Sequence, residues 1–148
     1  MNDDEAMRLA LQEAERAIEH EDVPVGALVI VDGLVIASRH NERQLTGDPT
    51  AHAEILALRD AASHLGTWHL DNSTLVTTLE PCPMCAGAAL NARVAHVIFG
   101  AHDPKAGAVE TLYNLLDDPR LNHQTKITSG VLAAQCGDIL SQFFAERR

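Results

Sequence analysis

The sequence predicts a three-layer α/β/α fold, in which a mixed five-stranded sheet opens with an antiparallel hairpin and carries helices on both faces. Two observations lead to this prediction. The apolar runs 23–31 and 34–37 flank Asp32-Gly33, a dipeptide that is typical of a tight two-residue hairpin turn. After this hairpin, helical and strand-like segments alternate along the chain, a pattern that is typical of parallel strand pairs covered by helices.

Two helices are expected around the hairpin. Before it, apolar residues recur at helical spacing over residues 7–18, and Asn2 or Asp3 stands where an N-cap is needed. After it, a second apolar stripe covers residues 55–65. Thr50 is the expected N-cap of this helix, and Gly66 is the residue expected to end it.

The second half of the chain completes the alternation. Residues 74–79 predict a third strand, residues 84–92 a helix of small residues, and residues 94–99 a fourth strand. The looser stretch 100–123 contains an expected helix around residues 110–116. A short fifth strand at 126–128 and a last helix over 131–144 follow.

Length and composition indicate one folded domain spanning residues 1–148. The chain has 46% apolar and 22% charged residues, which excludes the low-hydrophobicity, high-charge composition of disordered proteins. The amino terminus is acidic where a secretory signal requires positive charge, and no apolar run approaches the roughly 18 residues of a membrane span. We therefore expect a cytoplasmic protein that makes no membrane contact.

The formal net charge of −10 argues against broad, sequence-independent binding of nucleic acids, which depends on a basic face. The charge is unevenly distributed, however. Residues 1–22 hold eight acids and two arginines, so the other 126 residues hold 13 acids and nine basic groups. The balance in the rest of the chain is therefore compatible with a local basic patch.

The three cysteines are better suited to a metal site than to disulfides. Cys82 and Cys85 are three residues apart in Cys-Pro-Met-Cys, a spacing that favours a metal in a reducing compartment. Side chains three apart on a helix share a face, so both thiolates can reach one zinc ion. A helix N-terminus stabilises thiolate charge as well. Cys136 lies in an apolar helical stretch, where a buried packing role is expected.

His52 and Glu54 complete the predicted site. His52 is the third expected ligand of one zinc ion, which leaves one tetrahedral position open to water. Zinc lowers the pKa of such a water to about 7. Glu54 is the expected acceptor of the water proton and can return it to the substrate, so the site is suited to hydrolytic loss of ammonia. Both residues follow Pro49-Thr50, an expected helix start, where they can face one point beyond the helix tip.

A four-ligand structural zinc site is the alternative for the same residues. It would need a further ligand such as His96, His102 or His123, none of which has ligand spacing. Structural sites usually draw their ligands in two close pairs, whereas one half here is His-x-Glu. The pattern therefore favours a catalytic site.

The paired motifs His52-Ala-Glu54 and Pro81-Cys-Pro-Met-Cys85 resemble the signature of the zinc nucleobase deaminases. The resemblance extends over about residues 23–148, where the chain looks like the bacterial tRNA-specific adenosine deaminases. Further matching segments are 40–42, 48–54, 78–87, 99–101 and the pair Phe143-Phe144. It implies the cytidine-deaminase-like fold and hydrolytic conversion of adenosine to inosine at the wobble position of a tRNA anticodon. Zinc-activated hydroxide would attack C6 with Glu54 as the proton shuttle.

The resemblance also implies partners and further site residues. It implies a homodimer with one Zn²⁺ per subunit that binds a tRNA anticodon stem-loop. By position in the matched motifs, Asn41 would bind the flipped base, the Ala53 backbone would read its edge, and the other substrate contacts would be Val25, Asp103, Lys105 and Phe144. Simpler structural roles remain for several of them: a turn at Asn41, another at Asp103-Pro104, and a core position for at least one ring of the Phe143-Phe144 pair.

Two rival functions share parts of this pattern. A deaminase of a free base or nucleoside, of the guanine or cytosine type, would share every catalytic residue, and Pro83 also occurs in guanine deaminases. Against it, segments 100–107 and 121–124 resemble the tRNA enzyme. A noncatalytic zinc-stabilised RNA-binding or scaffold protein is the second rival. Glu54 argues against it, because a structural zinc has no use for a carboxylate beside an open position.

Overall fold

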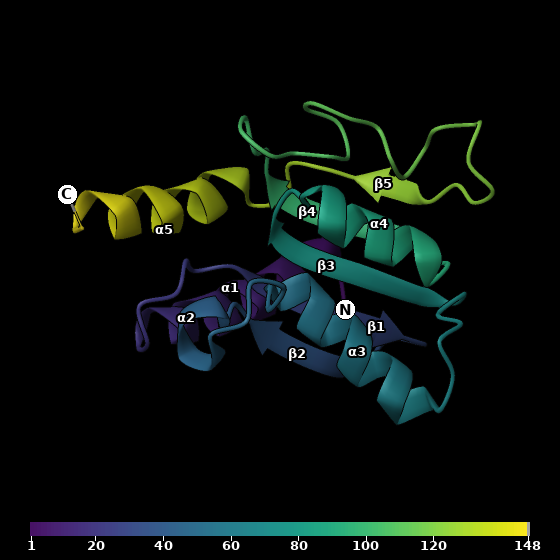
Figure 1. The fold of residues 1–148 in the computed structure, drawn as a ribbon, viewed down its shortest axis with the longest axis horizontal. Coiled ribbons are helices and arrows are strands. Elements are labelled where there is room, and N and C mark those ends of the chain that lie inside the picture. Colours follow the sequence, from purple (N-terminus) through teal and green to yellow (C-terminus); the bar gives the residue numbers. More distant parts are fainter. Residues whose placement is uncertain (148) are drawn as a thin grey trace.

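The computed structural model describes residues 1–147, and its elements follow the predicted alternation (Figure 1). The helices are α1 (Asp3–Ile18), α2 (Arg43–Thr46), α3 (Ala53–Leu65), α4 (Pro83–Asn91) and α5 (Ala133–Ala145). The strands are β1 (Gly26–Val31), β2 (Leu34–His40), β3 (Ser73–Leu79), β4 (His96–Ala101) and β5 (Lys126–Thr128). No helix within residues 1–147 is both long enough and apolar enough to cross a membrane.

The five strands form one mixed sheet in the order β2-β1-β3-β4-β5. Strand β1 is antiparallel to β2 and to β3, whereas β3, β4 and β5 run parallel. The turn between β1 and β2 has positive φ angles at Asp32 (52°) and Gly33 (76°), which the predicted tight hairpin requires. The predicted hairpin and mixed sheet are therefore confirmed.

Helices cover both faces of this sheet, with α3 and α4 on one face and α1 and α5 on the other (Figure 1). Successive strand residues point to opposite faces, so each strand supplies both cores. Leu28 and Val76 pack in the core with α1 and α5. Their neighbours Val29 and Leu75 pack in the larger core with α3 and α4. The three-layer α/β/α prediction is thus confirmed.

The start of α3 differs from the prediction. The N-cap is His52, not Thr50, because the Asp48 carboxylate accepts hydrogen bonds from both the backbone N–H and the hydroxyl of Thr50, each at 2.8 Å. Thr50 is thereby held in a turn ahead of the helix. The other end of α3 is as predicted, since Gly66 adopts the left-handed conformation (φ 69°) that ends a helix.

The expected helix around residues 110–116 is wrong. The N–H groups of Leu112 and Leu115 donate to the carbonyls of Gly107 and Ala108, not to carbonyls four residues upstream. The preceding N–H groups of residues 109–111 donate to the Glu80 carboxylate. Since a distant side chain organises this segment, it folds as turns despite its local helical pattern.

Gly26 allows α1 to lie close against β1, and we expect its replacement to be costly. A Cβ atom there would lie 1.9 Å from the Ala10 carbonyl oxygen and 2.7 Å from the Ala14 nitrogen. Gly26→Ala should therefore lower the free energy of unfolding by about 3 kcal/mol, as overpacking does. Denaturant titration measures it. The control is Gly137→Ala in α5, where a Cβ meets nothing within 4 Å. Equal unfolding midpoints for the two variants would contradict the prediction.

Candidate metal centre

Three side chains that are separated in the sequence converge at one point. One ligand atom of each of His52, Cys82 and Cys85 lies within 4.8 Å of the others. The Nδ1 atom of His52 is 3.6 Å from Sγ of Cys82 and 3.4 Å from Sγ of Cys85. The structure thus brings together the three predicted ligands in a group that could hold a metal ion.

The sheet topology explains why these residues meet. Strands β2 and β3 are both antiparallel to β1, so they run in the same direction and end at the same edge of the sheet. The helices that follow them, α3 and α4, begin at that edge with His52 and Cys82 as their N-caps. Cys85 lies in the first turn of α4. Pro83 is at the start of the same turn, where a backbone N–H would have no partner within the helix, so proline fits there.

The thiols lie in surroundings that favour the anionic form of Cys82. A hydrogen bond from Cys85 and the neighbouring His52 ring lower the pKa of the Cys82 thiol to about 4. The N-termini of two helices point at the same position, and their partial positive charge also stabilises a thiolate. Metal ligation requires such deprotonated sulfur.

The cluster has three members among the residues that the structure describes. The three histidines considered as a fourth ligand bond elsewhere. His96 contacts the Thr128 hydroxyl, His102 contacts the Glu110 carboxylate, and His123 contacts the Val94 carbonyl. A metal held by the three ligands would therefore keep an open coordination position, as in catalytic sites.

Glu54 lies beside the predicted ligands and is almost completely buried, with 4% of its surface exposed. It follows His52 by two residues at the tip of α3, and both side chains line the same cavity as Cys82. Burial raises the pKa of Glu54 to about 7. A carboxyl group with such a pKa can both accept and return a proton near neutral pH.

The site opens into a cavity of about 680 Å³, within the usual size range of small-molecule sites. It is bounded by the sheet edge, by the loop after β4 and by one side of α5. Eight of the predicted site residues line it: Val25, Asn41, His52, Glu54, Cys82, Asp103, Lys105 and Phe144. Ala53 and Cys85 lie behind this wall with no exposed surface.

Asn41 is fixed by two hydrogen bonds and is buried. Its side-chain amide donates to the Val23 carbonyl at 3.1 Å, and its carbonyl oxygen accepts from the Ala53 N–H at 2.7 Å. The two residues predicted to read a bound base are therefore bonded to each other in this structure. This bond joins the end of β2 to the start of α3.

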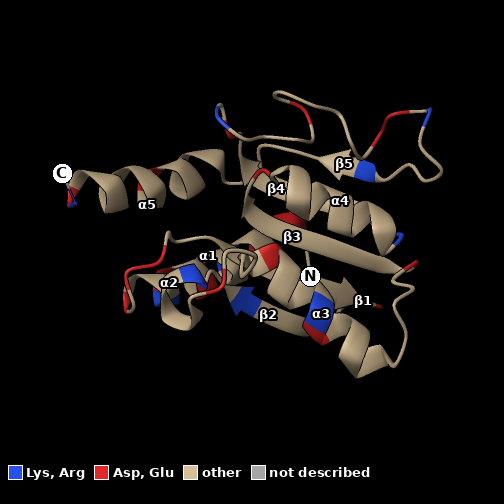
Figure 2. Cartoon of the chain, in the orientation of Figure 1, with Lys and Arg blue, Asp and Glu red and all other residues tan. Residues whose placement is uncertain are grey.

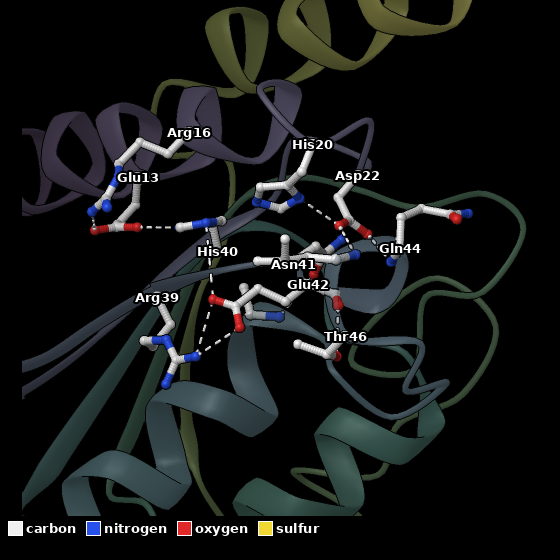
Figure 3. Close-up of polar contacts among 12 residues, drawn as sticks. Glu13, Arg16, His20, Asp22, Arg39, His40, Asn41, Glu42, Gln44 and Thr46 are labelled. Carbon is white, nitrogen blue, oxygen red and sulfur yellow. Dashed lines mark hydrogen bonds and ion pairs between the residues drawn. The ribbon is translucent and has the colours of Figure 1, made fainter.

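A polar network packs around the last residue of β2 (Figure 3). The Nδ1 atom of His40 lies 2.6 Å from the Glu13 carboxylate of α1, and its Nε2 atom lies 3.9 Å from the carboxylate of Glu42. Arg39 binds both oxygens of Glu42 and also Asp60 of α3. The network ties α1 and α3 to the end of β2, next to Asn41.

The short helix α2 adds a cavity residue that the sequence analysis did not single out. Asp22 accepts hydrogen bonds from the N–H groups of Gln44 (2.8 Å) and Leu45 (3.2 Å) and so caps α2 (Figure 3). The first residue of α2, Arg43, lines the cavity. A helix of four residues leaves no periodic pattern in the sequence by which to find it.

The loop after β4 carries two of the predicted residues. The Asp103 carboxylate accepts hydrogen bonds from the N–H groups of Lys105 and Ala106, so this stretch is a turn as well as a cavity wall. Glu80, at the end of β3, also lines the cavity and was not among the predicted site residues. Its position between a strand and the Pro-Cys motif was the available signal.

The two aromatic residues of α5 have different environments. Phe143 is buried, as expected for one ring of the pair, and the Arg147 guanidinium lies 3.7 Å from its centre. Phe144 is 49% exposed and lines the cavity. Of the two rings, Phe144 is the one that a bound substrate can reach.

Comparison with known proteins identifies the family. The family model of MafB19-like deaminases matches residues 1–148. The chain is 50% identical over 142 residues to the tRNA-specific adenosine deaminase of Bacillus subtilis, covering 96% of this chain and 88% of that protein. A structure from a study of A-to-I editing by tRNA:A34 deaminases matches with a TM-score of 0.88 at 42% identity, covering 92% of this chain and 99% of the other. The guanine deaminase of Nitrosomonas europaea matches with a TM-score of 0.80 at 27% identity, covering 96% and 84%. The chain therefore belongs to the deaminase family of the bacterial tRNA-specific adenosine deaminases.

Proposed function

We propose that this enzyme deaminates adenosine to inosine at the wobble position of a tRNA anticodon. The observation that carries the proposal is the group formed by Glu54 and the His52, Cys82 and Cys85 cluster at an open cavity. The choice of substrate is supported by relatives such as the Bacillus subtilis protein, which is named for adenosine in tRNA. The more distant guanine deaminase supports only the shared fold.

Zinc is the metal that we propose for the cluster, with one ion per subunit. Zinc–nitrogen and zinc–sulfur bonds of about 2.0 and 2.3 Å at a tetrahedral angle separate the two ligand atoms by roughly 3.5 Å. The distances from His52 Nδ1 to the two sulfur atoms, 3.6 and 3.4 Å, agree with this value. One histidine and two thiolates are also a donor set that zinc prefers over magnesium or calcium. Bound zinc would supply the acidity that activates the attacking water.

Glu54 is the residue that we assign to proton transfer. Deamination adds water across the N1–C6 double bond of adenine, after which the exocyclic C6–N6 bond breaks and ammonia leaves. In this assignment the Glu54 carboxylate takes a proton from the attacking water and delivers it to ring N1, then helps to protonate the departing amine. Glu54 lines the cavity beside His52 and Cys82, so its carboxylate can reach both the attacking water and the bound base.

The other predicted site residues are assigned to substrate binding. Asn41 and the Ala53 backbone would hydrogen-bond the flipped base, with Val25 against its face. To do so, Asn41 or the Ala53 N–H would exchange part of the bond between them for a bond to the base. Asp103, Lys105 and Phe144 would contact the flanking nucleotides, a role supported by their positions around the cavity.

The charge distribution fits recognition of a particular RNA shape better than broad attraction to phosphates. Figure 2 shows Lys and Arg residues dispersed over several elements rather than gathered on one of them. Arg43 and Lys105 are two cations that line the cavity, beside the acids Glu54, Glu80 and Asp103. Binding should therefore depend on the flipped base and its neighbours, with a modest salt dependence.

The substrate assignment is tested by mass analysis of products. Zinc-loaded protein is incubated with an anticodon stem-loop that carries adenosine at the wobble position, and in parallel with free adenosine, guanine and cytidine. Inosine from the stem-loop alone is the expected result. Turnover of a free base or nucleoside with the stem-loop unchanged would overturn the substrate assignment and favour the rival deaminase.

A homodimer in the cytoplasm completes the proposal. The dimer is supported by an apolar groove along α3 and α4, which could bind a second copy of the chain. Trp68 at this groove is 58% exposed, and the walls include Ile55, Leu58, Ala88 and Ala92. Sedimentation should give twice the chain mass of 16.0 kDa. A mass of 16.0 kDa at micromolar concentration would contradict the dimer.

The proposed tRNA substrate supports the cytoplasmic location.

A further inference from the structure

Glu80 is a buried carboxylate that holds both ends of one cavity loop. We call residues 102–111 the 102–111 loop. One oxygen, Oε2, accepts hydrogen bonds from the N–H groups of Val109 (3.1 Å), Glu110 (2.8 Å) and Thr111 (3.0 Å). The other oxygen, Oε1, accepts from the Asp103 N–H at 3.0 Å and from the Thr111 hydroxyl. Only 1% of the surface of Glu80 is exposed.

These bonds leave Glu80 unable to act in proton transfer. A carboxylate offers about four lone-pair sites, and five donors already occupy the Glu80 oxygens. Within residues 1–147 no ion pair of Glu80 with a cation is found, so its negative charge is stabilised by backbone dipoles of the loop. Burying a carboxylate is costly unless such bonds are made. The arrangement therefore points to a role through the loop.

The loop is shaped to fit this carboxylate. A Cβ atom on Gly107 would lie 2.3 Å from Oε1 of Glu80 and 2.7 Å from the Asp103 carbonyl oxygen. Only glycine leaves room for the carboxylate at this point. The Ala108 N–H donates to the carbonyl of Pro81, which adds a second link to the segment after β3.

The same loop forms one wall of the cavity. His102, Asp103 and Lys105 line it, whereas Glu54 and the metal ligands lie at the start of α3 and α4. The carboxylate of Glu80 thus connects the segment that carries Cys82 to the wall that faces the flanking nucleotides. A shift of this wall would change substrate binding without moving the metal ligands.

We propose that Glu80 is a positioning residue for RNA binding, which holds the 102–111 loop so that Asp103 and Lys105 engage the nucleotides beside the target adenosine. The inference rests on the proposed function for its substrate. It assigns to Glu80 an effect on substrate binding through the loop, separate from the chemistry at Glu54.

Glu80→Gln tests this role because it keeps the size of the side chain and replaces one acceptor with a donor. We expect KM for the anticodon stem-loop to rise about tenfold or more with kcat within about threefold of the parent, the pattern of lost ground-state binding. Zinc content should stay at one per chain. Hydrogen exchange at the amides of residues 103 and 109–111 should accelerate at least about tenfold, while amides of β3 and β4 keep their protection.

Two further variants make the test specific. Glu15→Gln is the matched control, because Glu15 is an exposed carboxylate of α1 that lies outside the 102–111 loop and the cavity lining, and it should leave KM and the loop amides unchanged. Gly107→Ala should raise KM as Glu80→Gln does, since it displaces the same carboxylate. In the double variant Glu80→Gln/Gly107→Ala, the free-energy effect on KM should be less than the sum of the two single effects, because both changes break one set of contacts.

The outcomes separate this inference from the proposed function. A parent protein that leaves the stem-loop unchanged overturns the proposed substrate, and the hydrogen-exchange comparison then still tests the loop contacts. A parent that edits the stem-loop, with unchanged KM and unchanged loop exchange in Glu80→Gln, overturns the role of Glu80. Equal losses of zinc and of global protection in Glu80→Gln and Gly107→Ala would also overturn it, because they would show a purely structural residue.

Discussion

Replacing Glu54 with glutamine is expected to stop deamination and leave the metal site occupied. Glutamine has nearly the same size and shape but cannot accept the proton of the attacking water. General acid–base groups contribute up to about 10⁴-fold in rate, and Glu54 would serve in both halves of the reaction, so a loss of at least about 10⁴-fold in kcat is expected.

Single-turnover assays with excess enzyme and an anticodon stem-loop measure this loss without interference from product release. Metal analysis of the same preparation should return one zinc per chain, since Glu54 is not among the clustered ligands. Glu15→Gln on the exposed surface of α1 is the matched control and should keep full activity. Loss of zinc or of folding in Glu54→Gln would contradict the assigned role, as would more than about 1% of the parent rate.

The sequence was sufficient for the features that depend on local chemistry. Asp32-Gly33 predicted the hairpin because few dipeptides adopt two successive positive φ angles. Gly66 predicted the end of α3 for a similar reason. Cys82 and Cys85 predicted a shared ligand position because their spacing and the helix geometry fix the distance between them.

Features that depend on distant partners were beyond local prediction. Asp48 holds Thr50 outside α3, and Glu80 directs the N–H groups of residues 109–111 away from a helix. Asp22 caps α2 from 22 residues away. In each case a carboxylate satisfies backbone donors that sequence periodicity would assign to a helix or its cap.

Buried carboxylates also explain how an acidic chain can present a defined RNA site. Asp22, Glu54 and Glu80 are each at most 4% exposed, so their charges face backbone donors or the reaction centre rather than bulk solvent. Hydrogen bonds from backbone N–H groups offset the free-energy cost of burying Asp22 and Glu80. The net charge of −10 therefore overstates the repulsion that an anticodon loop meets at the cavity, where Arg43 and Lys105 also lie.

Removing one thiolate ligand is the second change with a large expected effect. Cys85→Ser should reduce bound zinc from one per chain to less than about 0.1 per chain, since a neutral hydroxyl is a far weaker ligand than a thiolate. Activity should fall with it, because His52 and Cys82 alone cannot hold the metal in place. Thermal unfolding should shift to lower temperature, because metal bound only by the native state stabilises it.

Cys136→Ser and Cys136→Ala provide the matched controls, because Cys136 is also buried and free but packs beside Gly100 in the core with α1. Both should keep one zinc per chain and full editing activity, whatever they cost in packing. Treatment of the parent with a strong chelator should reproduce the Cys85→Ser state, and added zinc should restore activity only in the parent. Full zinc occupancy in Cys85→Ser would show that the metal has other ligands. Full activity in the metal-free parent would show that Glu54 works without a metal, and the site would then have to be interpreted as a structural one.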